Sequence, residues 1–240
     1  MKIIIFIPTY NEKENICILI DRIIDLYPEY YILIVDDNSP DGTANIIKQN
    51  YKKLLNKKIY LIIRTQNRGR GLAGIEGYRN SLLLGADIII EMDGDLSHRP
   101  EYIKEMLKYI PSYDVIIGSR YVKEGTDSQR SILRKLISFL AKFYIKFILG
   151  IHLKDPTSGF RVFKKEVIEK ILPYLNASDP FIVTEVYYYT KLFGFKNKEI
   201  PIIFYKRFKG KTKLNKRILL KYLFNVLKLK FKTKINKKNQ

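Results

Sequence analysis

The sequence predicts an α/β fold in which a mostly parallel central sheet carries helices on both faces. Short runs rich in Ile and Val alternate with amphipathic helical stretches through the first half of the chain. Strands that are apolar on both sides need helices on both sheet faces. The chain has 240 residues, 46% of them hydrophobic, which suffices for one large domain with a full core.

Five strands and four helices are expected to alternate along the first half of the chain. The expected strands are residues 3–7, 31–35, 59–63, 87–92 and 114–117. The expected helices are residues 13–27, 42–55, 72–85 and 100–109. Because ligands bind beyond the carboxyl ends of the strands in such sheets, the residues that follow each strand are candidate site residues.

Two carboxylates follow the fourth expected strand: Asp93 and Asp95, separated by Gly94. Mg²⁺ binds oxygen ligands, typically one or two carboxylates together with substrate phosphates. The glycine would let a ligand approach the backbone closely. An Asp-rich turn that caps the helix near Pro100 is the alternative, and this motif alone leaves both interpretations open.

The second expected strand also ends in acidic residues, within residues 36–43 (DDNSPDGT). Asp37 is placed to hydrogen-bond a ribose or a base, as acidic residues do in nucleotide-binding α/β sheets. Asn38, Ser39 and Asp41 could instead start the next helix. Two acidic strand ends on one sheet edge are harder to explain as helix caps, so together they favour a nucleotide site.

Residues 69–74 (GRGLAG) match the GxGxxG pattern of dinucleotide-binding proteins. That pattern should follow the first strand of its unit, whereas this one follows the third expected strand. We therefore reject an NAD site and expect a flexible loop and a helix start beside the nucleotide site.

The chain has a formal net charge of +20, most of it near the C-terminus. From Lys196 onward there are 16 Lys and Arg residues and a single acid, Glu199. A region this basic binds an anionic partner, and composition leaves open nucleic acid, anionic lipid or a phosphorylated substrate. One cysteine fits a reducing cytoplasmic compartment, and two histidines exclude a His/Cys metal cluster.

The strand-end motifs resemble those of the family-2 glycosyltransferases, and in particular the dolichol-phosphate (polyprenol-phosphate) mannosyltransferases. They are residues 8–12 (PTYNE), 36–43, 92–98 (MDGDLSH) and 118–121 (GSRY). The match continues through residues 155–161 (DPTSGFR), 201–207 and 210–214 (GKTKL), and covers roughly residues 1–225. Several motifs in the right order make this resemblance specific.

The resemblance implies a GT-A type fold, with a catalytic domain over residues 1–205 and a basic, membrane-facing loop and tail over residues 206–240 that is part of the site. It implies an inverting transfer of mannose from GDP-mannose to dolichyl or polyprenyl phosphate, giving dolichyl phosphate mannose. A divalent cation, Mg²⁺ or Mn²⁺, would assist.

The resemblance also assigns roles to individual residues. The nucleoside would be held by Pro8, Tyr10, Glu12, Val35 and Asp37. The diphosphate and the metal would be held by Asp93, Gly94 and Asp95, with Asp95 favoured as the direct metal ligand. The acceptor phosphate would be bound by Arg120, Arg134 and Ser138, and Arg207 and Lys213 would close over the donor diphosphate.

Two positions depart from the family's pattern. Gly94 stands where the family usually has alanine, which should be tolerated because this position offers mainly its backbone. Ser97 stands where some members place a glutamine metal ligand. Its hydroxyl or a water could take that place, so the metal preference stays open.

A phosphate acceptor removes the need for a general base. A sugar hydroxyl must lose a proton in order to attack, whereas a phosphate monoester with a second pKa near ~6 is already mostly dianionic at neutral pH. It needs positioning and charge, which Arg and Lys supply. Glu185 is a candidate base, but a partly exposed helix carboxylate paired with Lys or Arg is the favoured interpretation.

Residues 130–150 form a basic amphipathic helix without any acid. Its Lys and Arg residues share one arc with Ser138, opposite a broad apolar face. Such a helix suits a lipid interface, although packing of the apolar face on the sheet is an equal alternative. No uncharged apolar run of 18 residues occurs, so we expect a peripheral protein at the cytoplasmic face of a membrane, with or without an anchor subunit.

The sequence leaves two alternative functions. Transfer of glucose or another sugar to the same lipid phosphate is the alternative within the same class. A non-catalytic protein that binds nucleic acid or an anionic membrane is the alternative outside it. Acidic strand ends would repel phosphate unless a metal intervened, so we expect no nucleic-acid partner.

Overall fold

In a computed structural model of the chain, residues 1–127, 132–206 and 216–238 are described, except for the side chains of 132–135, 216–218 and 232–238. The strands are β1 (Ile3–Thr9), β2 (Tyr31–Asp36), β3 (Ile59–Ile63), β4 (Ile88–Glu91), β5 (Val115–Ser119), β6 (Arg161–Lys164) and β7 (Asn197–Pro201). The α-helices are α1 (Lys13–Leu26), α2 (Thr43–Asn50), α3 (Arg70–Leu83), α4 (Tyr102–Leu107), α5 (Ile132–Leu149), α6 (Lys165–Ile171), α7 (Ile182–Leu192) and α8 (Lys216–Lys238).

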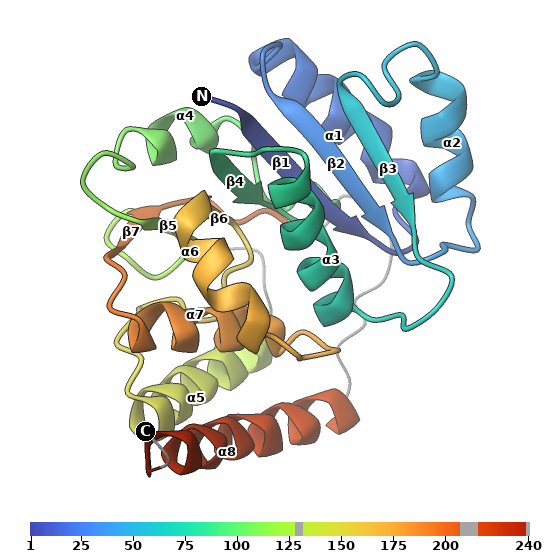
Figure 1. The fold of residues 1–240 in the computed structure, drawn as a ribbon. Helices are drawn as coiled ribbons and strands as arrows, with labels where there is room; N and C mark the ends of the chain where they lie inside the picture. Colours follow the sequence, from blue (N-terminus) through green and yellow to red (C-terminus); the bar gives the residue numbers. More distant parts are fainter. Residues whose placement is uncertain (128–131, 207–215, 239–240) are drawn as a thin grey trace.

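One sheet of seven strands runs through the molecule in the order β3-β2-β1-β4-β6-β5-β7 (Figure 1). All neighbouring pairs are parallel except the two that involve β6, which runs antiparallel between β4 and β5. The five strands expected in the first half of the chain are confirmed within two residues at each end. The α/β class with a mostly parallel sheet is therefore confirmed.

Helices cover both faces of the sheet because the strands bury side chains on both sides. On one face, Ile3, Ile5 and Ile7 of β1 pack with apolar residues of α1, α2 and α4. On the other face, Ile4 and Phe6 pack with apolar residues of α3, α6 and α7. Successive residues of one strand therefore belong to two different cores, as the two-sided pattern predicted.

The second half of the chain holds elements that the sequence pattern did not predict. These are β6, β7, α6 and α7; β6 lies between β4 and β5, and β7 is the edge strand beside β5. Residues 206–240, expected as a loop and tail, include the long helix α8. The helix expected over residues 42–55 is shorter, because α2 ends at Asn50 and turns follow.

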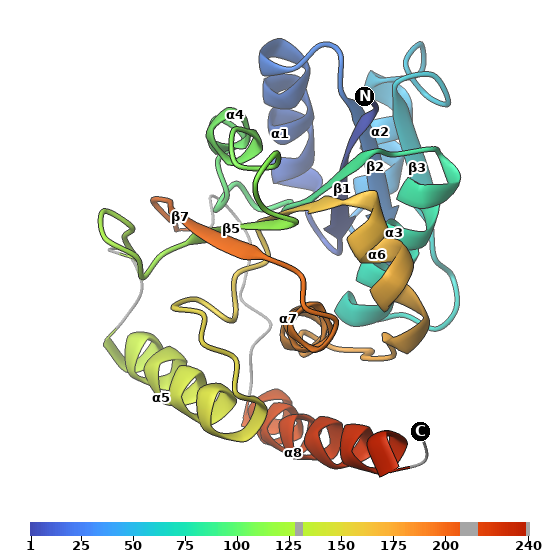
Figure 2. The same cartoon turned by 60° about the vertical axis from the view of Figure 1, so that its left-hand side comes forward.

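Helices α5 and α8 lie side by side at the end of the molecule below α7 (Figures 1 and 2). The hydroxyl of Tyr144 on α5 donates a hydrogen bond to the carbonyl oxygen of Leu223 on α8 at 3.0 Å. Ile145 and Val226 anchor the two helices in the core below α7. None of the described helices is long and apolar enough to cross a membrane.

Candidate active site

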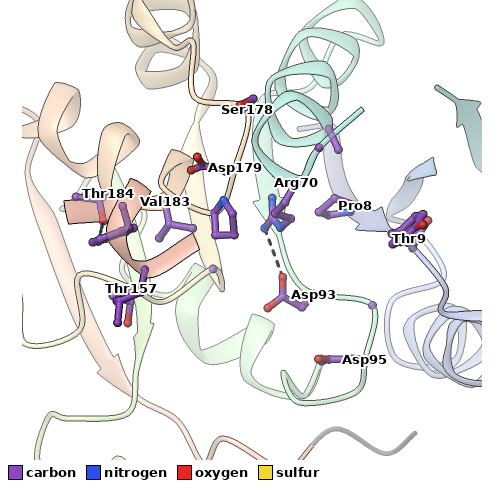
Figure 3. A pocket seen from close by; sticks show the side chains of 18 of the residues that line it. Pro8, Thr9, Arg70, Asp93, Asp95, Thr157, Ser178, Asp179, Val183 and Thr184 are labelled. Atoms are coloured by element: carbon purple, nitrogen blue, oxygen red, sulfur yellow. Dashed lines mark hydrogen bonds and ion pairs between the residues drawn. The ribbon is translucent and has the colours of Figure 1, made fainter. Parts of the chain in front are cut away.

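A cavity of about 580 Å³ opens at the carboxyl ends of β1 and β4. The start of α3 and the loop before α7 contribute to its wall (Figure 3), and residues of α5, α7 and α8 also line it. The predicted site residues that line it are Pro8, Tyr10, Glu12, Asp93, Gly94, Asp95, Arg120 and Ser138. The structure thus brings predicted donor and acceptor residues into one cavity.

Asp93 and Asp95 follow β4 directly, and both reach the cavity (Figure 3). The Asp93 side chain is 37% exposed, and its Oδ1 lies 3.4 Å from Nη2 of Arg70. Asp95 is largely buried, and its Oδ1 accepts hydrogen bonds from the backbone N–H and the hydroxyl of Ser97. The two carboxylates thus differ: Asp93 faces a cation, while Asp95 is held by a tight local turn.

That turn is shaped by Leu96, whose φ of 64° lies in the left-handed region that a leucine rarely adopts. His98 closes the turn, since its Nδ1 accepts the backbone N–H of Asp93 at 3.2 Å. Burial lowers the pKa of His98, which favours the neutral ring that this hydrogen bond requires. The cap interpretation of these aspartates is wrong, because α4 begins without a side-chain cap.

The donor set around Asp93 and Asp95 fits a hard divalent cation that is shared with a substrate. Among the described residues, no group of three or more His, Cys, Asp and Glu could hold a metal by itself. Two carboxylates that face a cavity suit Mg²⁺ or Mn²⁺ when diphosphate oxygens complete the coordination. Ser97 is buried, does not line the cavity and donates to Asp95, so its hydroxyl orients a carboxylate.

The expected nucleoside residues divide into two groups. Pro8, Tyr10 and Glu12 line the cavity. Val35 is fully buried in the core between α3 and the sheet and does not line the cavity. Asp37 does not line it either, so the structure brings together three of these five residues.

Asp37 holds the loop between β3 and α3. Its Oδ1 accepts a hydrogen bond from Arg64, and its Oδ2 accepts the backbone N–H of Gly69 at 2.7 Å. Arg68, in the same loop, lies over the ring of Tyr10 at 5.2 Å. The carboxylate that was assigned to the nucleoside therefore ties this loop against the β2 strand end.

The glycines of the GRGLAG segment serve close packing. A Cβ atom on Gly69 would come within 2.3 Å of the Ser178 carbonyl oxygen, and one on Gly71 within 2.0 Å of the Ala177 carbonyl oxygen. The Gly71 N–H donates to the Ser178 carbonyl at 3.1 Å. The expected helix start beside the site is confirmed, since α3 begins at Arg70.

Arg120 lines the cavity and is held by a buried carboxylate. Its Nε and Nη2 donate to the two oxygens of Asp155, each at 2.7 Å, and Nη2 also donates to Thr157. Burial would raise the pKa of Asp155, but the charge and hydrogen bonds of Arg120 lower it overall. Glu199 of β7 in turn accepts the backbone N–H of Asp155 at 2.8 Å.

The other expected phosphate ligands are only partly described. Ser138 of α5 lines the cavity near Arg120. Arg134 lies on the first turn of α5, and its side chain falls outside the described residues. Arg207 and Lys213 fall wholly outside the described residues.

A buried charge cluster lies behind Asp93 and was not predicted from the sequence. Glu91 is fully buried, and its Oε2 accepts hydrogen bonds from Tyr78 at 2.6 Å and from Arg161. Its Oε1 accepts from Arg70 at 2.8 Å. The only signal for Arg70 was its place in a rejected GxGxxG match, and nothing in the sequence pattern pairs Glu91 with Arg161.

Glu185 has a structural role. It is buried and does not line the cavity, and its Oε2 accepts the backbone N–H groups of Asn176 at 3.0 Å and Ala177 at 2.9 Å. The carboxylate is therefore buried rather than partly exposed, and it does not face the cavity, as a catalytic base would have to. Glu185 fixes the loop before α7, against which Gly69 and Gly71 pack.

Comparison with known proteins identifies sequence relatives over nearly the whole chain. A family model described as "Glycosyl transferase family 2" matches residues 4–172. The undecaprenyl-phosphate mannosyltransferase of Micrococcus luteus is 33% identical over 227 residues, or 94% of this chain and 93% of that protein. The polyprenol monophosphomannose synthase of Mycolicibacterium smegmatis is 33% identical over 93% of this chain and 84% of that protein.

Solved structures share the fold at low sequence identity. Glucosyl-3-phosphoglycerate synthase from Mycobacterium tuberculosis, in complex with Mn²⁺, UDP and phosphoglyceric acid, has a TM-score of 0.73 at 14% identity, covering 95% of this chain and 78% of that one. A mannosyltransferase from Pyrobaculum calidifontis, in complex with GDP-Man and Mn²⁺, has a TM-score of 0.59 at 16% identity, covering 98% and 64%. The expected GT-A type fold is thereby confirmed.

Proposed function

Because this chain belongs to glycosyl transferase family 2, we propose that it transfers mannose from GDP-mannose to a dolichyl or other polyprenyl phosphate at a membrane surface. Membership of this family makes it a sugar-transferring enzyme. The observation that carries the proposal is a single cavity whose lining combines the carboxylates of Asp93 and Asp95, the guanidinium of Arg120 and apolar side chains of α5, α7 and α8.

The carboxylate end suits the donor. Tyr10, Glu12 and the Asp93–Asp95 segment surround it, at the strand ends where nucleotides bind in open α/β sheets. A divalent cation bound to these carboxylates would stabilise negative charge on the departing diphosphate. GDP as the nucleotide is supported by the sequence likeness to mannosyl-transferring enzymes and by GDP-Man in the Pyrobaculum structure.

The guanidinium of Arg120 suits the acceptor phosphate. Asp155 fixes the plane of this guanidinium, so it enters the cavity already oriented. A phosphate there would direct one oxygen at the anomeric carbon, with GDP leaving from the opposite side and inversion at that carbon. Because a dianionic phosphate is already a nucleophile, no side chain has to remove a proton, which agrees with the structural role of Glu185.

The apolar end suits the lipid. Ile137 and Ala141 of α5, Val183 of α7 and Leu219 of α8 line it. Tyr222 closes the wall, with its hydroxyl hydrogen-bonded to Thr184 and its ring edge-on to Phe181 at 5.5 Å. A polyprenyl chain attached to a phosphate at Arg120 would leave the cavity between α5 and α8.

Both of these helices present large apolar side chains to solvent. The exposed residues are Leu136, Phe139, Leu140, Phe143 and Phe147 on α5, and Leu220, Phe224, Leu227 and Phe231 on α8. Phe147 is 88% exposed. Lysines are interleaved with them, which is the composition of helices that lie in a lipid interface. We place the cytoplasmic face of a membrane against α5 and α8.

A panel of donors and acceptors tests the proposed reaction. The purified chain is incubated with Mn²⁺, polyprenyl phosphate in detergent, and GDP-mannose, GDP-glucose or UDP-glucose with a labelled sugar. We expect labelled lipid in the organic extract with GDP-mannose, and little with the other two donors. Preferred use of a glucose donor would show that the transferred sugar is glucose and not mannose. Release of free sugar without labelled lipid would show that the lipid phosphate is not the acceptor.

Flotation with vesicles tests the membrane placement. Anionic vesicles should carry the chain at low salt, since each basic residue near such a surface contributes about 1 kcal/mol. High salt should screen this electrostatic contribution and leave the contribution of the exposed apolar side chains of α5 and α8. Phe147→Ser should weaken flotation at high salt, whereas Leu83→Ser, exposed on α3, is the matched control. Equal flotation of both variants would contradict the placement.

A further inference from the structure

Arg70 stands between the buried charge cluster and the cavity. It is the first residue of α3, it lines the cavity, and Figure 3 shows its side chain directed at Asp93. One nitrogen, Nη2, contacts two carboxylates: Oε1 of Glu91 at 2.8 Å and Oδ1 of Asp93 at 3.4 Å. A fixed cation therefore neutralises the more exposed of the two carboxylates proposed for the metal.

The Glu91 side of this arrangement is rigid. Glu91 and Arg161 are fully buried, and the guanidinium of Arg161 also donates to the Val183 carbonyl oxygen and to Tyr78. Separating such a buried pair would leave an uncompensated charge in the core, which is strongly unfavourable. The two side chains therefore stay together. Through its hydrogen bond to Glu91, this pair holds the Arg70 guanidinium beside Asp93.

The Asp93 side is looser. The contact of 3.4 Å is long for a charged hydrogen bond, which usually falls near 2.7–2.9 Å. Nη1 of Arg70 is buried and has no hydrogen-bond partner among the described residues. The contact between Arg70 and Asp93 is therefore mainly electrostatic, and it is longer than the hydrogen bond between Arg70 and Glu91.

We propose that Arg70 is a positioning residue that acts as the resident counter-cation of Asp93 and lowers the affinity of the site for a free divalent cation. The inference rests on the proposed donor site at Asp93 and Asp95. A cation near Asp93 experiences the repulsion of Arg70 unless diphosphate oxygens arrive with it and balance the charge. Metal and nucleoside diphosphate should therefore bind together far better than the metal binds alone.

The test is a titration of the full chain with Mn²⁺, in which electron paramagnetic resonance measures the free ion. The titration is done first without GDP and then with GDP. Arg70→Gln should bind Mn²⁺ alone roughly three- to tenfold more tightly than the wild type, since a unit charge next to the ion is removed. The enhancement by GDP should shrink. Arg70→Lys keeps the charge and should stay close to the wild type.

Arg79→Gln is the matched control, because it removes the same charge from an exposed position of α3. It should leave Mn²⁺ binding unchanged. Equal or weaker Mn²⁺ binding by folded Arg70→Gln would overturn the proposal, and so would the absence of Mn²⁺ binding in all variants. If the wild type transferred no mannose while Arg70→Gln still bound Mn²⁺ more tightly, the proposed function would be contradicted and the role of Arg70 would stand.

Discussion

The two ends of the cavity are built in different ways. The end proposed for the donor, called the donor end below, consists of short segments at the carboxyl ends of β1 and β4, and its chemistry comes from carboxylates such as Asp93 and Asp95. The end proposed for the acceptor, called the acceptor end below, is assembled from the residue after β5 and from α5, α7 and α8, which are far apart in the chain. Its one described cation, Arg120, is set in an apolar surface. If the proposed function holds, donor chemistry depends on strand ends, whereas acceptor recognition depends on packing between distant elements.

Removal of the Asp95 carboxylate should have the largest effect. Asp95→Asn keeps the size of the side chain and an oxygen for Ser97, but loses the charge that a cation requires. Transfer should fall by at least about 100-fold while the melting temperature stays close to that of the wild type. Transfer rates and thermal unfolding measure the two effects. A large loss of stability with transfer retained would make Asp95 a turn residue.

A change at Arg120 should affect only the acceptor side. Arg120→Lys keeps the charge but cannot form the bidentate pair with Asp155. The KM for polyprenyl phosphate should rise about tenfold, with the KM for GDP-mannose nearly unchanged. Arg22→Lys, at a partly exposed position of α1, is the control. If the donor KM rose instead, the two ends of the cavity would be assigned the wrong way round.

Glu185→Gln separates structure from catalysis. An amide oxygen can still accept the N–H groups of Asn176 and Ala177, although less strongly, so stability should fall by about 1 kcal/mol. Transfer at neutral pH should remain within a few-fold of the wild type, because the acceptor needs no base. Rates measured from pH 5 to pH 8 check this. Loss of transfer at full stability would restore Glu185 as a base.

Gly94→Ala should have the smallest effect. A Cβ atom would meet side-chain carbons of Thr9 at 3.2 Å and Ile7 at 3.3 Å, so these neighbours must shift by a few tenths of an ångström. We expect a loss of about 1 kcal/mol in stability and nearly normal transfer. Thermal unfolding and steady-state rates test it. A collapse of donor binding would show that the glycine itself is needed for the approach of a ligand.

The donor end was predictable because its signals are local. A buried strand followed directly by Asp93, Gly94 and Asp95 places those residues at the sheet edge without knowledge of the rest of the fold. Pro8 lies near the end of β1, and Tyr10 and Glu12 follow it; the resemblance to a family assigned these three residues to the nucleoside, and all six residues line the cavity. The sequence did not reveal that Asp37 accepts hydrogen bonds from Arg64 and Gly69, since a carboxylate can accept them from the protein as well as from a ribose.

The acceptor end was less predictable because its contacts are long-range. The partner of Arg120 is Asp155, 35 positions away, and the antiparallel strand β6 brings that segment beside β5. The hydrophobic periodicity of the sequence does not show that an antiparallel strand lies between β4 and β5. Likewise, Tyr222 reaches Thr184 only because α8 packs below α7. The resemblance to a family supplied Arg120 and Ser138, which spacing alone could not.

The central claim is that a lipid phosphate oxygen attacks the anomeric carbon of the donor within this cavity. Polyprenyl phosphate with ¹⁸O in its non-bridging oxygens tests it directly by mass spectrometry of both products. The account predicts that the mannosyl lipid retains all of the label and that the released GDP contains none. Label in GDP, or release of free mannose without any mannosyl lipid, would contradict it.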